Sequence, residues 1–310
     1  MLRYLIRRLV SMLIVLWVIV TVTFALMHAI PGGPFTAEKA LPPSIQKNLE
    51  ARYHLNDPLL KQYFDYLKNL LRWDLGPSFK YEGRTVNDII NEGFPVSAQL
   101  GLVAVAISLL VGIPTGIISA LCRNRWQDNV AMFLATIFVS VPNFILASVL
   151  MLVFALKLRW FPAAMWGEPS QVVLPALSLT GFPTAFISRL TRSSMVEVME
   201  QDYIRTARAK GLSRSAVVIK HALKNALIPV VTYLGPLLAA ILTGSFVVEN
   251  IFAIPGLGRH FVTSIYNRDY TVILGVTVFY SVLLVVLNFI VDLTYAIIDP
   301  RIKFSDTGKE

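Results

Sequence analysis

The sequence predicts an all-α protein that crosses a membrane six times, with a small folded subdomain between the first two spans. Three observations support this fold class. Of the 310 residues, 55% are hydrophobic and 15% are charged, whereas soluble domains have about 45–50% apolar and about 25% charged residues. Six apolar stretches lack formal charge. Basic residues are concentrated in alternate connecting segments.

The first span is predicted at residues 9–29, which carry no formal charge. At about 1.5 Å per residue, a helix of this length crosses a hydrocarbon core about 30 Å thick. The basic residues before it resemble the start of a secretory signal. The stretch is longer than the apolar region of such a signal, and no clear cleavage site follows, so we expect it to be retained.

The remaining spans are predicted from five further uncharged stretches. These cover residues 97–121, 130–156, 172–188, 226–248 and 272–291. Several contain proline, including Pro114, Pro142, Pro183 and Pro236, and small residues such as Gly112, Gly116 and Gly235. Kinked helices with small residues usually pack closely against other helices, so a tight helical bundle is expected.

The orientation follows from the distribution of lysine and arginine. The N-terminus, the 122–129 and 189–225 segments and the C-terminal tail hold 16 of the 28 basic residues, and the alternate segments hold 12. Residues 31–94 account for eight of those 12 but form a segment too long for the positive-inside rule. Without that segment the ratio is 16 to 4, which predicts that both termini are cytoplasmic.

The composition also argues against nucleic-acid binding, a disulfide framework and a metal site. The formal net charge of +9 follows the membrane topology and does not indicate nucleic-acid binding. One cysteine and four scattered histidines provide neither a disulfide framework nor a clustered set of metal ligands. We therefore expect no metal, no bound cofactor and no catalytic residue in this chain.

Residues 31–94 predict the folded extracytoplasmic subdomain. After Pro58, apolar side chains recur every three or four residues from Leu59 to Leu71, which indicates an amphipathic helix. Asn56 or Asp57 is the expected cap of this helix. The 8 basic and 8 acidic residues of the subdomain balance each other, which is typical of a folded surface and makes it a possible landing site for an external partner.

The segment 189–225 is too long and too regular for a simple connection. Asp202 is expected to cap a short helix over 203–210, and Gly211 to end it in a left-handed turn. Ile204, Ala207 and Gly211 should form one face that docks in the groove of a partner. Ser213 should begin a second helix with an apolar line of Ile219, Leu223 and Leu227.

This segment, YIRTARAKGLSRSAVVIKHALKNALIPVVT, resembles the cytoplasmic loop of permease subunits of ATP-binding-cassette importers. In that family a pattern E-A-A, three residues, Gly docks on the ATPase subunit. Its positions are matched here by the segment from Arg205 to Gly211, although the glutamate is absent. The implied ATPase-coupling residues are Arg205, Thr206, Ala207, Arg208, Ala209, Lys210 and Gly211.

The strings FPVSAQLG, LTGSFVVENIFAIPGLGRHFVTSIYNRDY and YAIIDPRI resemble the oligopeptide, dipeptide and nickel branch of these importers. LPPSIQKNLEARYHLNDP is similar to the first permease subunit of oligopeptide importers. The resemblance implies a type I importer fold and half of a pathway that a second, homologous permease completes. It also implies two ABC ATPase subunits, an extracytoplasmic peptide-binding protein, a peptide substrate and a bacterial inner membrane.

The resemblance and the topology together predict the domain boundaries. Residues 1–30 form the N-terminus and first span, 31–94 the extracytoplasmic subdomain, 95–298 the permease core and 299–310 the tail. The chain contains no G-x-x-x-x-G-K-[ST] motif, so ATP and Mg²⁺ are expected on the partner ATPases and not on this chain. No substrate-lining residue is identified.

Several alternatives remain open. Dipeptides, nickel and other peptide-like molecules are the alternative cargo. An ion-coupled secondary transporter should show several ionisable residues within the membrane, but only Asp292 lies in an apolar stretch, near the inner edge. An intramembrane hydrolase needs a nucleophile and a base at the same depth, and His28 near the outer end is the only histidine within a span.

Overall fold

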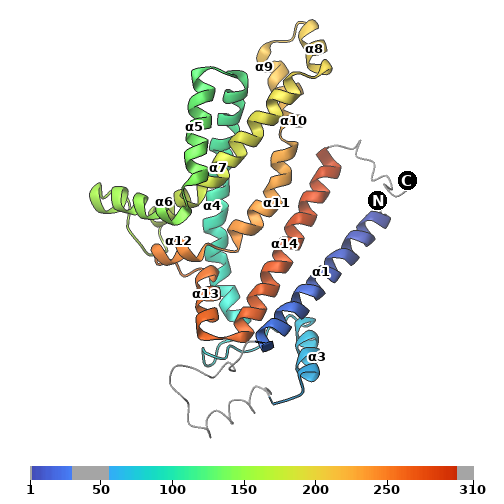
Figure 1. The fold of residues 1–310 in the computed structure, drawn as a ribbon, viewed down its shortest axis with the longest axis vertical. Helices are drawn as coiled ribbons and strands as arrows, with labels where there is room; N and C mark the ends of the chain where they lie inside the picture. Colours follow the sequence, from blue (N-terminus) through green and yellow to red (C-terminus); the bar gives the residue numbers. More distant parts are fainter. Residues whose placement is uncertain (1, 30–55, 299–310) are drawn as a thin grey trace. The chain divides into compact units, whose positions relative to one another are not determined.

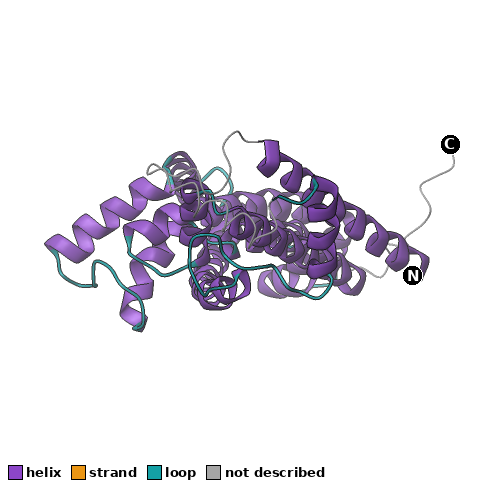
Figure 2. Cartoon of the chain, turned by 90° about the horizontal axis from the view of Figure 1, so that it is seen from below, coloured by secondary structure: helices purple, strands orange, loops and turns teal. Residues whose placement is uncertain are grey.

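A computed structural model describes the backbone of residues 2–29 and 56–298, and within these ranges the side chains from residue 6 to residue 291. The regular structure of the described residues is helical (Figure 2). One isolated bridge joins Pro77 and Thr85. The prediction of an all-α fold is confirmed. Asp292 and the first part of the predicted 31–94 subdomain lie outside the described side chains.

Five helical segments are long and apolar enough to cross a membrane. They comprise α1 (Leu2–Ala29), α4 (Val86–Leu121), α7 (Pro169–Met199), α11 (Ile228–Leu242) followed by α12 (Phe246–Ile251), and α14 (Tyr270–Ile298) (Figure 1). Each covers all or nearly all of one predicted apolar stretch. A sixth crossing is reached if one bent pair of helices counts as a single span.

The bent pair covers the stretch 130–156, where a single span kinked at Pro142 was predicted. Helix α5 (Trp126–Ser140) ends before Pro142, and α6 (Asn143–Leu150) continues through the π-helix η1 (Met151–Lys157) at 102° to α5. Val141 is extended, with ψ at 117°, because a residue before proline is disfavoured in the helical region. The predicted kink at Pro142 is therefore a complete break.

The chain divides into two compact units. Unit 1 comprises residues 1–95 and 256–285, and unit 2 comprises residues 96–255 and 286–310. The predicted boundaries near 30, 94 and 298 remain predictions about function and topology, since the units are defined by packing alone.

Unit 1 contains α1, α3 (Leu59–Leu70), α13 (Leu257–Asn267) and the adjoining parts of α4 and α14. The amphipathic helix predicted after Pro58 is confirmed as α3, although Pro58 itself occupies the capping position. The core of unit 1 joins residues from both ends of the chain: Leu75, Val86, Ile89, Ile90, Leu257, Val272 and Val276. Helix α4 begins with a capping box, in which Thr85 and Asp88 exchange backbone and side-chain hydrogen bonds.

Unit 2 contains the helices from α5 to α12 and most of α4. Helix α7 begins with a capping box between Glu168 and Gln171, with Pro169 at the first helical position. Between α7 and α11 the chain forms α8 (Asp202–Ala209), α9 (Arg214–Ala216), η2 (Val217–Ala222) and α10 (Leu223–Ala226). Figure 1 shows α8 and α9 at the end of unit 2 where α4 turns into α5.

Candidate functional site

The predicted coupling segment forms a short exposed helix that is joined to α7 by a single turn. Helix α8 follows Gln201, which is the capping residue in place of the predicted Asp202. Gly211 has φ at +77°, and its N–H donates to the Arg208 carbonyl over 3.0 Å. The predicted left-handed turn is therefore confirmed, and glycine adopts this conformation without a steric penalty.

Two residues of the face of α8 that was predicted to dock on a partner are buried within this chain. Ile204 is 0% exposed and Ala207 is 5% exposed, because both pack inside this chain against Met195, Val217 and Val218. Of the predicted coupling residues, Ala207 lies inside. The others are exposed: Arg205, Thr206, Arg208, Ala209, Lys210 and Gly211. The surface available to a partner is therefore basic and polar.

The helical segment after α8 packs against its buried face. Ser213 caps α9 by accepting a hydrogen bond from the Ala216 N–H, as predicted. The predicted apolar line is wrong at Ile219, which is 65% exposed. Leu223 is partly buried beside Val218, Ala222 and Ala226, and Leu227 packs against a second apolar cluster. The π-helical turn η2 lengthens the hydrogen-bond spacing and so rotates the following residues away from α-helical register.

A hydrogen bond between side chains adds to this support. The Asn225 Nδ2 donates to the Tyr203 hydroxyl over 2.8 Å. The contact ties α8 to α10 from the exposed side.

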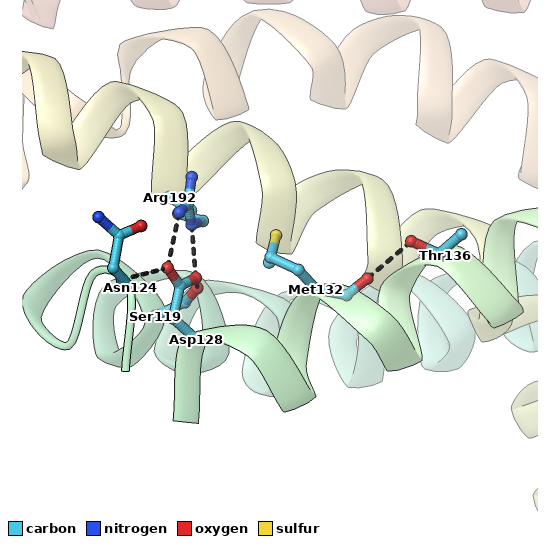
Figure 3. Close-up of polar contacts among 6 residues, drawn as sticks. All are labelled: Ser119, Asn124, Asp128, Met132, Thr136 and Arg192. Carbon is cyan, nitrogen blue, oxygen red and sulfur yellow. Dashed lines mark hydrogen bonds and ion pairs between the residues drawn. The ribbon is translucent and has the colours of Figure 1, made fainter. Parts of the chain in front are cut away.

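A buried ion pair lies at the same end of unit 2 (Figure 3). The Arg192 Nε and Nη2 atoms on α7 donate to the Asp128 Oδ1 and Oδ2 atoms on α5, each over 2.6 Å. Asp128 is 2% exposed and Arg192 is 27% exposed. The same carboxylate accepts from the Asn124 N–H over 2.9 Å and from the Ser119 hydroxyl on α4.

Both arginines at this end of α7 are bound to residues of α5. Arg192 pairs with Asp128, and Arg189 donates from Nη2 to the Thr136 hydroxyl over 2.6 Å. Thr136 in turn donates to the Met132 carbonyl over 2.8 Å (Figure 3). The sequence analysis did not identify Asp128 as a partner of Arg192, because the two residues are 64 positions apart. The position of Asp128 just outside an apolar stretch was the only sign of a special role.

The helices that carry this ion pair are in very close contact. A Cβ atom on Gly116 of α4 would lie 2.5 Å from the Ser188 carbonyl oxygen and 2.6 Å from the Thr191 Cβ on α7. The expectation that small residues mark close helix contacts is confirmed at this crossing.

Two further buried carboxylates were also missed. Glu249 on α12 is 0% exposed and accepts from the Ser97 hydroxyl over 2.8 Å. In unit 1, Asp269 accepts from the Ser78 hydroxyl and from the Phe79 N–H over 3.1 Å. Its position directly before α14 was a recognisable capping signal. Among the residues that the structure describes, no cluster of three or more metal-ligating side chains occurs.

Comparison with known protein families gives the context for this geometry. The profile of the binding-protein-dependent transport system inner membrane component matches residues 112–304, and the profile of the N-terminal region of such membrane components matches residues 1–101. The chain belongs to this family. A binding-protein-dependent transport component is a membrane-spanning subunit and not an enzyme by itself.

Several members of the transport family are similar along their whole length. The dipeptide transport system permease protein DppB of Bacillus subtilis is 54% identical over 99% of this chain and 100% of that protein. The oligopeptide transport system permease protein OppB of Haemophilus influenzae is 47% identical over 98% and 100%, and that of Escherichia coli is 44% identical over the same shares.

Solved structures agree with the fold of this transport component. An inward-facing structure of the MetNI methionine ABC transporter aligns with a TM-score of 0.55 over 68% of this chain and 96% of that chain, at 20% sequence identity. A second crystal form gives a TM-score of 0.57 over the same shares. These alignments support the type I importer fold of the membrane domain.

Proposed function

We propose that this chain is a permease subunit of an ATP-driven peptide importer and forms half of its translocation pathway. The observation that carries the proposal is the full-length similarity to permease proteins of dipeptide and oligopeptide transport systems. A second, homologous permease completes the pathway, two ABC ATPases supply the energy, and an extracytoplasmic binding protein delivers the peptide. The 54% identity to a dipeptide permease favours short peptides within this range of cargo.

The 201–213 segment is the proposed contact with the ATPases. Its support is the geometry of α8, whose inner face is fixed by Ile204 and Ala207 while Arg205, Arg208 and Lys210 are exposed. A short helix held on one side and exposed on the other is suited to a groove on a partner. In this proposal α8 is on the cytoplasmic side of the inner membrane, with both termini, as the distribution of basic residues indicates.

Reconstitution tests the proposal. Proteoliposomes that contain this chain, its partner permease, both ATPases and the binding protein should import a labelled dipeptide when ATP is enclosed and no ion gradient is applied. A matched complex with catalytically inactive ATPases is the control. Import that depends on a proton or sodium gradient and does not depend on ATP would reject the proposal in favour of a secondary transporter.

Two substitutions in α8 test the contact separately from the fold. Arg208→Glu reverses an exposed charge, so we expect weaker binding of the ATPases with unchanged stability of the chain. Ala207→Asp buries an unpaired charge, so it should destabilise the α8 region itself. If the Arg208→Glu chain binds the ATPases with unchanged affinity in co-purification titrations, the exposed face of α8 is not the contact.

A further inference from the structure

The Asp128–Arg192 pair joins three helices at the end of unit 2 that carries α8. Asp128 belongs to α5, Arg192 to α7, and Ser119 of α4 donates to the same carboxylate. The backbone N–H of Asn124, in the turn between α4 and α5, fills a further acceptor position. The carboxylate is therefore the common point of contact for α4, α5 and α7 (Figure 3).

The same helices hold α8. Met195, three residues after Arg192 on α7, is buried in the apolar cluster that contains Ile204 and Ala207 of α8. Ile117 and Ala120, on either side of Ser119 in α4, pack against that cluster as well. The ion pair thus extends the apolar contacts of α8 to a helix, α5, that contributes no residue to that cluster.

The chemistry of the pair favours a rigid link. Two parallel N–H···O bonds from a planar guanidinium to a carboxylate fix both distance and orientation. Because Asp128 is almost completely buried, loss of one partner would leave the other charge without compensation. The nearby Arg123–Glu200 pair, at 3.0 Å, differs because both side chains are more than half exposed and screened by solvent.

We propose that Asp128 and Arg192 are positioning residues that make α5 follow the movement of α8. This inference rests on the proposed function, in which the ATPases displace α8. The displacement reaches α7 directly through the polypeptide and through Met195. It reaches α5 through the packing of α5 on α7 and the Arg189–Thr136 hydrogen bond and, at the end nearest α8, through the guanidinium–carboxylate contact. Without the pair, the end of α5 nearest α8 follows α7 less closely, so that fewer peptides cross the pathway for each ATP hydrolysed.

The test is the number of peptides imported per ATP hydrolysed by the complete reconstituted complex. Asp128→Asn keeps the shape of the side chain and removes its charge. Arg192→Lys keeps the charge and removes the bidentate hydrogen bonding. We expect each to lower the ratio about tenfold, by analogy with the size of coupling effects between binding sites, while ATP hydrolysis stays close to that of the unsubstituted complex. Arg123→Gln, which breaks the exposed pair, is the matched control and should leave the ratio unchanged.

A reversible cross-link distinguishes coupling from simple bracing. Asp128→Cys and Arg192→Cys are combined in a Cys122→Ser background and treated with a short, reducible thiol cross-linker. The ratio should be low before treatment, recover with the cross-link and fall again with reductant. Each single cysteine variant, treated in the same way, should not recover.

The outcomes decide between the alternatives. An assembled Asp128→Asn complex that keeps its ratio, a control that loses the ratio equally, or a completed cross-link without recovery overturns the inference. Loss of assembly in the substituted complexes, with a normal ratio in every complex that does assemble, assigns the pair a bracing role and also overturns it. If the unsubstituted complex does not couple ATP to import at all, the proposed function fails instead.

Discussion

Replacing Gly116 with alanine should force α4 and α7 apart at their closest contact. The added Cβ would lie 2.5 Å from the Ser188 carbonyl oxygen and 2.6 Å from the Thr191 Cβ. Non-bonded carbon atoms are most stable about 3.5–4.0 Å apart, so the helices must separate by about 1 Å. Neither obstacle can rotate away, because one is backbone and the other is the branch point of a buried side chain.

The energetic cost follows from this geometry. Overpacking in a well-packed core typically costs about 1–3 kcal/mol, and a clash with backbone places Gly116→Ala near the upper limit. Gly112→Ala should cost less, since its nearest atoms, on Thr184 and Ile187, lie 3.0 Å away. Leu110→Ala, on the same helix with a side chain that is 75% exposed, should change the free energy of unfolding by less than about 0.5 kcal/mol.

The assay is equilibrium unfolding of the three purified variants in mixed micelles with increasing denaturing detergent, followed by circular dichroism. The expected order of destabilisation is Gly116→Ala, then Gly112→Ala, then Leu110→Ala. If Gly116→Ala costs no more than Leu110→Ala, the close contact between α4 and α7 does not exist in the folded protein.

Three further predictions concern other regions. Burial, and secondarily two nearby arginines, lowers the pKa of His260, so the folded state binds fewer protons than the unfolded state below about pH 6.5. The free energy of unfolding should therefore fall from pH 7.5 to pH 5.5. An equal fall in the His260→Gln variant would contradict this assignment. Asp269→Ala should cost about 3 kcal/mol, because the Phe79 N–H and the Ser78 hydroxyl lose a buried acceptor, and hydrogen exchange at Phe79 should accelerate. Cys122 should resist a membrane-impermeant maleimide applied from outside to intact cells, and labelling without lysis would reverse the proposed topology.

The spans were predictable because length and apolarity decide whether a helix can cross a membrane. The break at Pro142 was not, since Pro175 and Pro183 lie inside the unbroken α7. Proline removes a backbone hydrogen bond in all three positions, and the surrounding packing determines whether the helix continues. The same residue type therefore gives opposite outcomes that the local sequence does not distinguish.

The candidate site was predictable in its local features and not in its long-range ones. The short helix before Gly211 and the Ser213 cap follow from nearest-neighbour chemistry. The burial of Ala207 depends on Met195 and on the π-helical turn after Ala216. The Asp128–Arg192 pair depends on two helices meeting in space, and a single sequence carries no record of which carboxylate an arginine will find.

The discontinuity of unit 1 has a consequence for biosynthesis. Its core combines Val86 and Ile89 with Leu257 and Val272, so the first half of the core leaves the ribosome long before the second half exists. During that interval unit 2, which lies almost wholly between them in the sequence, can fold first. A truncated chain that ends before α13 should therefore retain a folded 96–255 part of unit 2 and an incomplete unit 1. The exposed apolar surface of Val86 and Ile89 would make it a substrate for membrane quality-control proteases.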